Sequence, residues 1–146
     1  MQFIDLKAQY AALKDEIDAN MQEVLNDAAF IGGKYVRELE TQLAAFTGRK
    51  HCITCANGTD ALQLAFMALG VGEGDAVFAP DMTFISSTEP AAMFGAVSVF
   101  CDITPDTYDL DPASLERQIK AVLAEGKYTP KAVVAVDILG NPCDYD

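Results

Sequence analysis

The first part of the chain alternates apolar and charged residues with the period of an amphipathic helix. Between Asp5 and Ala28, apolar side chains recur every three or four residues, and most charged side chains lie on the opposite face. This pattern predicts one long helix, and a second helix over about residues 35–46 that ends near Gly48. Gly32 and Gly33 interrupt the pattern, either as a simple break between helices or as a mobile loop beside a site.

From residue 51 onward, short apolar runs alternate with segments of helical spacing. The runs predict strands over residues 51–55, 76–79, 97–101 and 131–139, the last of them covered on both faces because it is almost continuously apolar. The segments between them predict helices that start after a turn at 56–59, span about 85–94 and span about 112–124. This alternation predicts an α/β fold of three layers, a mainly parallel sheet with helices on both faces.

A tight turn joins the first predicted strand to the helix that follows it. Gly58 allows the backbone to bend closely, and the hydroxyl of Thr59 lies in reach of the unpaired N–H groups of the first helical turn. Such a helix start attracts anions, phosphate above all. An ordinary turn that is capped by Thr59 and binds nothing explains the same local pattern.

Polar and aromatic residues follow the other predicted strands. In a parallel sheet, ligands bind at the carboxyl ends of the strands. The segments that reach this edge are 57–59, 83–84, Asp102 and Asp137. Their convergence favours a phosphate site over an ordinary turn. A dinucleotide site would require Gly-x-Gly-x-x-Gly after the first strand, and a P-loop would require a lysine, and the turn provides neither.

Charge and length exclude several classes of protein. The 146 residues are 51% hydrophobic, which is enough to build a core, and the formal net charge of −12 argues against a nucleic-acid partner. The chain has no N-terminal segment of signal-peptide type and no apolar run long enough to cross a bilayer. We therefore expect a cytoplasmic protein without a membrane partner.

The four cysteines are scattered along the chain, which predicts reduced thiols rather than a disulfide framework. Cys52 and Cys55 have the spacing of a redox pair or of half a zinc site. On a strand, however, residues three apart point to opposite faces, and the chain has no second such pair. We therefore expect no metal site.

Several segments together resemble the DegT/DnrJ/StrS family of sugar aminotransferases, which are pyridoxal-phosphate enzymes of fold type I. They are Phe3-Ile4-Asp5-Leu6-Lys7, Phe30-Ile31-Gly32-Gly33 with Glu38-Leu39-Glu40, 56–62, Thr83-Phe84, Asp102-Ile103 with 108–112, and 140–146. The resemblance covers the chain from Phe3 to its last residue. It is strongest to enzymes that aminate the 3-keto group of UDP-linked N-acetylated uronic acids, although neighbouring members of the family use other keto sugars.

The resemblance implies pyridoxal 5′-phosphate as the cofactor. Gly58 and Thr59 would bind its phosphate, and Phe84 would stack on its pyridine ring, since flat aromatic rings pack well in an offset arrangement. An ordinary core aromatic is the alternative for Phe84. Glu89 and Asp137 lie near the same edge and are weaker candidates. Asp137 also departs from the family pattern, because relatives often carry His or Ser at its position.

Members of this family are more than twice as long as this chain. The resemblance therefore implies N-terminal helices over about residues 5–48 and the first part of the cofactor-binding large domain over about 49–146. The lysine that binds the cofactor covalently falls outside the matched pattern, so we expect no catalytic residue within these residues and no activity of the 146 residues alone. The strand at 51–55 would also lack a neighbour, and we expect it to be re-paired or disordered unless further strands accompany it.

The implied activity is the transfer of an amino group, from glutamate, to a nucleotide-linked keto sugar in cell-surface polysaccharide or amino-sugar biosynthesis. The resemblance also implies a homodimer with its active site at the subunit boundary, near Gly32 and Gly33. Two alternatives stay open. One is a sugar dehydratase of the same family. The other is a non-catalytic α/β module that holds a phosphorylated ligand through Gly58 and Thr59.

Overall fold

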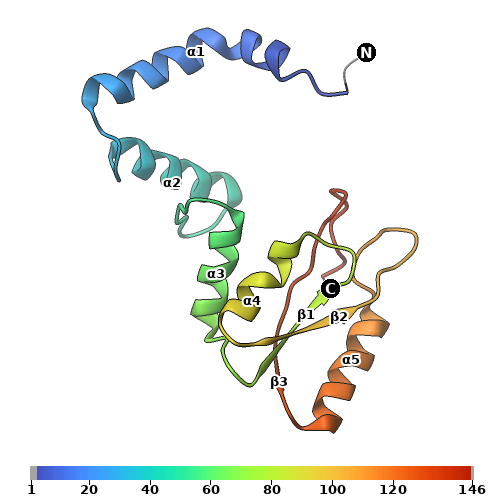
Figure 1. The fold of residues 1–146 in the computed structure, drawn as a ribbon. Coiled ribbons are helices and arrows are strands. Elements are labelled where there is room, and N and C mark those ends of the chain that lie inside the picture. The colour runs from blue at the N-terminus through green and yellow to red at the C-terminus, as the bar shows by residue number, and fades with distance from the viewer. Residues whose placement is uncertain (1–2, 146) are drawn as a thin grey trace. The chain divides into compact units, whose positions relative to one another are not determined.

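The computed structural model describes residues 3–145 and divides the chain into two units, of which the first ends at Thr54 and the second begins at Cys55 (Figure 1). The first unit contains the helices α1 (Leu6–Asp27) and α2 (Lys34–Thr47). The second contains α3 (Gly58–Leu69), β1 (Asp75–Pro80), η1 (Ile85–Ser87), α4 (Glu89–Met93), β2 (Val97–Cys101), α5 (Pro112–Glu125) and β3 (Thr129–Val133).

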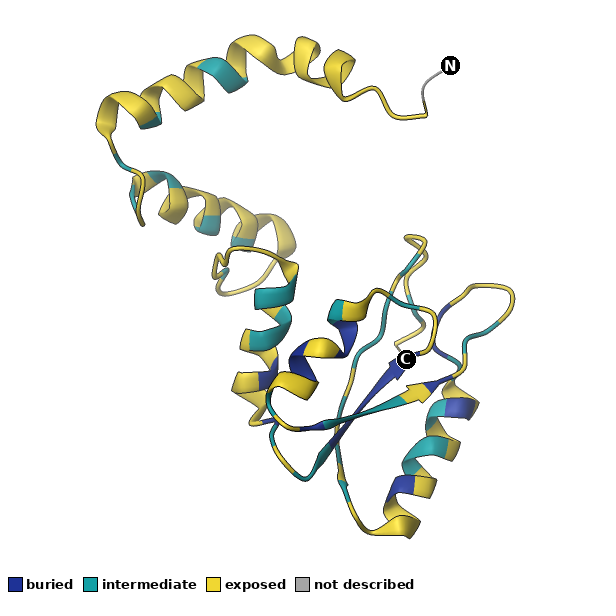
Figure 2. Cartoon of the chain, viewed as in Figure 1, coloured by how far each residue is buried: buried dark blue, intermediate teal, exposed yellow. Residues whose placement is uncertain are grey.

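The two predicted N-terminal helices are confirmed. Asp5 caps α1, because its carboxylate accepts a hydrogen bond from the backbone N–H of Ala8 at 2.9 Å. Gly48 ends α2 with a φ of 66°, a left-handed conformation that favours glycine. Neither helix contains a buried residue, and Figure 2 shows both almost entirely in the exposed class. The apolar stripe that predicted these helices is therefore uncovered.

A parallel sheet with helices on both faces forms the second unit, as the alternation of strands and helices predicted. The strand order is β2-β1-β3, and β1 pairs in parallel with both neighbours. Phe78 in the middle of β1 lies opposite Val99 of β2 and Val133 of β3. The segments that follow the three strands therefore leave the sheet at one common edge (Figure 1).

The core has two parts because alternate residues of a strand point to opposite faces of the sheet. Val77 packs with residues of α3 and α4, whereas Ala76 and Phe78 pack with residues of β2 and α5. The first cluster consists of Phe66, Val71, Val77, Ala91 and Ala96, and the second of Ala76, Phe78, Cys101, Leu110 and Val122. β1 is thus the buried centre of the unit (Figure 2).

The strand predicted over residues 51–55 does not form. The sheet within residues 3–145 has three strands, and none of them pairs with this segment. Instead, the carboxylate of Glu40 accepts hydrogen bonds from the N–H and the hydroxyl of Thr54, both at 2.9 Å. These bonds hold the pKa of Glu40 below its usual range. The expectation that 51–55 would lack a strand neighbour agrees with this arrangement.

The last predicted strand is shorter and more exposed than the apolar run suggested. β3 ends at Val133, and its residues alternate between exposed and half-buried. One further ladder bond joins the N–H of Val134 to the carbonyl of Phe78 at 2.8 Å. Pairing stops there because β1 ends at Pro80, which has no N–H to donate. Alternate residues of β3 are exposed in the described chain, so one face of the strand is uncovered and the prediction of cover on both faces was wrong there.

The helix predicted over residues 85–94 is two short elements, η1 and α4, separated at Thr88. A continuous helix would place Pro90 in its interior, where proline lacks the N–H for the ladder and its ring clashes with the preceding turn. Restarting the helix at Glu89 places Pro90 in the first turn instead.

No helix within residues 3–145 is both long and apolar enough to span a lipid bilayer.

Candidate functional site

The start of α3 has the structure of an anion-binding helix end, with a different cap from the one that we predicted. Asn57, not Thr59, is the N-cap: its side-chain oxygen accepts the N–H of Asp60 at 2.9 Å. Its amide nitrogen donates to the Asp60 carboxylate at 3.3 Å. This reciprocal pair has the spacing of a capping box, a signal that is present in the sequence and that the prediction of a Thr59 cap overlooked. The hydroxyl of Thr59 is therefore not needed as the cap.

Gly58 is the first residue of α3, and the fold places no steric demand for glycine there. Its φ is not in the positive range that glycine favours, and a Cβ added to it would meet no atom within 4 Å. The N–H groups of Gly58 and Thr59 belong to the first turn, where backbone donors have no partner within the helix. Unpaired N–H groups at a helix start are the donors that bind a phosphate oxygen, and the side-chain position of Gly58 beside them is open.

Phe84 lies at the same edge of the sheet, four residues after β1 ends, and its side chain is 70% exposed. Within residues 3–145, the ring is therefore not part of the buried core. The neighbouring backbone is held in place by a hydrogen bond of 2.7 Å between the hydroxyls of Thr83 and Ser87. Ser87 and Thr88 are buried behind it. An exposed ring on a fixed backbone is suited to stacking on a flat ligand.

The two weaker candidates are in different surroundings. Glu89 is exposed at the first position of α4. Asp137 is exposed on the segment after β3, where its Oδ1 accepts the N–H of Cys143 at 3.1 Å and the hydroxyl of Tyr145 at 3.3 Å. The Cys143 N–H is the main reason that the pKa of Asp137 lies below its usual range. Asp137 is thus already part of a local network.

Four of the five predicted site residues lie on, or directly before, elements that pack against one another. α3 packs against both η1 and α4, and a hydrogen bond of 3.5 Å from the Gln63 amide to the Met93 sulfur joins the two helices. Gly58, Thr59, Phe84 and Glu89 lie on these three elements. Within residues 3–145, no hydrogen bond or ion pair links Asp137 to them. The cofactor role predicted for Asp137 therefore has the least support.

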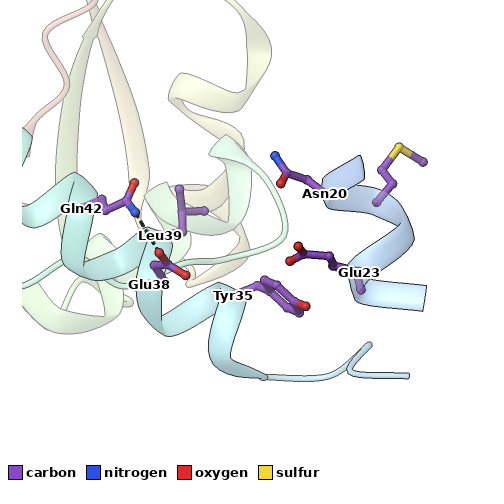
Figure 3. A pocket seen from close by; sticks show the side chains of 8 residues that line it. Asn20, Glu23, Tyr35, Glu38, Leu39 and Gln42 are labelled. Carbon is purple, nitrogen blue, oxygen red and sulfur yellow. Dashed lines mark hydrogen bonds between the residues drawn. The ribbon is translucent and has the colours of Figure 1, made fainter. Parts of the chain in front are cut away.

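A separate groove lies between α1 and α2 in the first unit (Figure 3). Its volume is about 540 Å³, and its lining includes Asn20, Glu23, Tyr35, Glu38, Leu39 and Gln42. Figure 3 shows the Gln42 amide donating to the Glu38 carboxylate, a hydrogen bond of 3.2 Å. The groove contains none of the predicted site residues, and its two carboxylates would repel a phosphate. The start of α3 remains the better anion site.

Comparison with solved structures identifies close matches to the whole described fold. A DegT DnrJ EryC1 StrS aminotransferase from Brucella abortus superimposes with a TM-score of 0.96 at 43% identity, over 99% of this chain and 39% of that one. S. venezuelae DesV, solved in complex with a ketimine intermediate, matches with a TM-score of 0.87 at 34% identity, over 98% of this chain and 37% of that one. Both matches support the predicted fold type I aminotransferase architecture.

Curated relatives agree with the structural matches. The UDP-2-acetamido-2-deoxy-3-oxo-D-glucuronate aminotransferase of Pseudomonas aeruginosa is 49% identical over 100% of this chain and 39% of its own length. The UDP-N-acetyl-3-dehydro-alpha-D-glucosamine 3-aminotransferase of Acidithiobacillus ferrooxidans is 40% identical over 97% of this chain and 36% of its own. The chain thus spans less than two-fifths of the length of these relatives. The profile of the DegT/DnrJ/EryC1/StrS aminotransferase family matches residues 11–146, and the chain belongs to that family.

Proposed function

We propose that the protein to which these residues belong is a pyridoxal-phosphate-dependent aminotransferase, and that this chain provides part of its cofactor site. Gly58 and Thr59 would hold the phosphate through their N–H groups, and Phe84 would cover the ring. The observation that carries the proposal is the 49% identity to a nucleotide-sugar aminotransferase over 100% of the chain. The cofactor, when bound, would supply the electron sink for transfer of the amino group.

The residues at this edge fit such a group. A Cβ added at Gly58 would meet no protein atom within 4 Å, so the space beside the helix start is open, and the reciprocal Asn57–Asp60 pair keeps that start in place. The Asp60 carboxylate is held by the Asn57 amide, which reduces its repulsion of the phosphate. The exposed ring of Phe84 has a face available for stacking.

Three of the seven lysines of the chain lie in the second unit. In the second unit, Lys120 lies on α5 and pairs with Glu116 at 2.5 Å, Lys127 follows α5, and Lys131 is exposed on β3. We assign the residues at this edge a role in binding the cofactor, and we do not assign the covalent step to any of these three lysines.

For the substrate, we propose a UDP-linked 3-keto sugar of the N-acetylated uronic acid type, with glutamate as the amino donor. The support comes from the two relatives above, whose names both describe amino transfer to a 3-oxo or 3-dehydro UDP-sugar. The proposal extends to a cytoplasmic enzyme of cell-surface polysaccharide or amino-sugar biosynthesis.

The test is an assay of the full-length protein with pyridoxal phosphate, glutamate and UDP-2-acetamido-2-deoxy-3-oxo-D-glucuronate. We expect release of 2-oxoglutarate in equal amount to the amino sugar formed, together with an absorption band that free pyridoxal phosphate lacks. A nucleotide-linked 4-keto sugar is the control and should react poorly. Absence of the band, or loss of water from the sugar without gain of nitrogen, would contradict the proposal, the latter in favour of a dehydratase.

We further propose that the full-length protein is a homodimer whose cofactor sites lie near the subunit boundary. The support is the uncovered apolar stripe of α1 and α2, in which Leu6, Leu13 and Met21 are each about half exposed or more. Light scattering at micromolar protein concentration should give twice the mass of one chain. A fully active monomer under the same conditions would contradict the proposal.

A further inference from the structure

Two segments at the carboxyl edge of the sheet bring one aspartate close to two side chains that follow it by about 30 residues in the sequence. Asp109 lies on the loop between β2 and α5, and Asp137 and Cys143 lie on the segment after β3. One ligand atom from each, two carboxylate oxygens and the Cys143 sulfur, lie within 4.8 Å of one another. Neither carboxylate forms an ion pair with a lysine, arginine or histidine among residues 3–145. Negative charge therefore gathers here without a cation to balance it.

A buried oxygen without a partner marks the inner side of this cluster. Asp109 is only 8% exposed, and its Oδ2 accepts a hydrogen bond from the Asn141 amide at 2.9 Å. Its other oxygen, Oδ1, is the one buried side-chain oxygen or nitrogen in the described part of the chain that has no hydrogen-bond partner. A buried carboxylate oxygen without a partner costs free energy, so it indicates that a ligand pairs with this oxygen.

A cavity lies beside this cluster of side chains. Asp109 and Cys143 line the same cavity of about 350 Å³, with Thr104, Leu110 and Tyr145 in its wall. Asp137 is joined to the cavity lining through the hydrogen bonds from Cys143 and Tyr145. The Asn141 amide orients the Asp109 carboxylate, as outer partners orient the ligands of metal sites.

We propose that Asp109, Asp137 and Cys143 bind a zinc ion. A thiolate with two carboxylates suits zinc, whereas Mg²⁺ and Ca²⁺ take oxygen ligands only. Bonds of about 2.0–2.3 Å in a tetrahedron place ligand atoms about 3.5 Å apart, so a pair separated by the full 4.8 Å must close by about 1.3 Å. Binding forms one Zn–S and two Zn–O bonds and releases the thiol proton to solvent, while water takes the fourth position.

This site is distinct from the proposed phosphate site at the start of α3, and it reverses our expectation of no metal site. It assigns Asp137 to the metal instead of the cofactor. The zinc ion would join the β2–α5 loop to the segment after β3, which the Asn141–Asp109 hydrogen bond already holds together.

The test is zinc binding to the untagged full-length protein, stripped of metal by a chelator and kept free of pyridoxal phosphate, which itself binds metals. Competition with a chromophoric chelator should show one zinc per chain. Asp109→Asn and Cys143→Ser should each weaken binding at least about 100-fold, since even partners outside the ligand set affect metal affinity by about 10–100-fold. The matched controls are Asp106→Asn, an exposed carboxylate on the same loop, and Cys55→Ser, an exposed thiol outside the cavity. Both should bind zinc like the unmodified protein.

Cobalt provides a second measurement that depends on the sulfur ligand. The Co²⁺ form should show a sulfur-to-cobalt absorption band in the near ultraviolet that Cys143→Ser alone abolishes. Circular dichroism checks that each variant is folded, and if Asp109→Asn is not, Cys143→Ser decides the question. No stoichiometric zinc uptake, or equal affinity in all four variants, would overturn the proposal. Because the measurement contains no cofactor and no substrate, it stands or fails independently of the aminotransferase assay.

Discussion

Gly58→Val will remove most of the cofactor affinity of the full-length protein without lowering its stability. The added side chain enters the open space beside the first turn of α3, where the new Cβ meets no protein atom within 4 Å, and it should hinder a phosphate bound to that turn. Two charge-assisted hydrogen bonds to a phosphate, at about 1.5–3 kcal/mol each, correspond to a loss of about 100-fold or more in affinity. Valine has a higher helix propensity than glycine, so the free energy of unfolding should stay equal or rise slightly. Fluorescence titration and chemical denaturation measure the two effects.

Three controls make this result specific. Gly58→Ala should give a smaller loss of about tenfold, and Gly72→Ala should give none, since Gly72 also lacks a positive φ but lies at the other end of β1. Pyridoxal without its phosphate should bind Gly58→Val and the unmodified protein equally. If pyridoxal loses as much affinity as pyridoxal phosphate, the space at Gly58 does not hold the phosphate.

The sequence predicted the elements whose signals are local. Asp5 and Gly48 mark helix ends through their own side chain or backbone conformation, and β2 has the same bounds in the prediction and in the structure. The sheet was predicted well because alternation of strands and helices leaves few topologies. The strands predicted over residues 51–55 and 134–139 do not form, because the formation of a strand depends on more than a local signal. An apolar run indicates only that a strand is possible, and pairing depends on neighbours that lie elsewhere in the chain.

The candidate site shows the same contrast between local signals and contacts of residues far apart in the sequence. Gly58 and Phe84 stay predictions, which rest on local patterns: a Gly-Thr pair at a helix start and an aromatic residue shortly after β1. The Asn57 cap was overlooked although Asn57 and Asp60 have the spacing of a reciprocal cap. The approach of Asp109 to Cys143 could not have been found, because it depends on how two loops fold. Tyr108, which precedes Asp109, has a φ of 63°, a conformation that no local signal in a tyrosine predicts.

Phe78→Ala and Phe84→Ala are substitutions of the same kind six residues apart, but only the first will lower the free energy of unfolding substantially. Phe78 is 1% exposed and packs with Ala76, Cys101, Leu110 and Val122. Its removal leaves a cavity at the centre of the sheet and should lower the free energy of unfolding by about 3–5 kcal/mol. Phe84 is 70% exposed, and its removal should change the free energy of unfolding by no more than about 0.5 kcal/mol. Chemical denaturation of the full-length protein without cofactor compares the two.

The affinity for the cofactor provides a second measurement, in which Phe84→Ala should have a clear effect. Loss of a stacked ring costs about 0.5–1.5 kcal/mol beyond the buried area, so Phe84→Ala should weaken pyridoxal phosphate binding by about tenfold. Pyridoxal without phosphate should lose affinity to the same degree, because stacking involves the ring, and this distinguishes Phe84→Ala from Gly58→Val. Phe84→Leu, which keeps the bulk of the side chain without the aromatic face, should resemble Phe84→Ala. If Phe84→Ala instead destabilises the protein as much as Phe78→Ala does, the full-length protein buries this ring in its core, and its role in covering the cofactor is wrong.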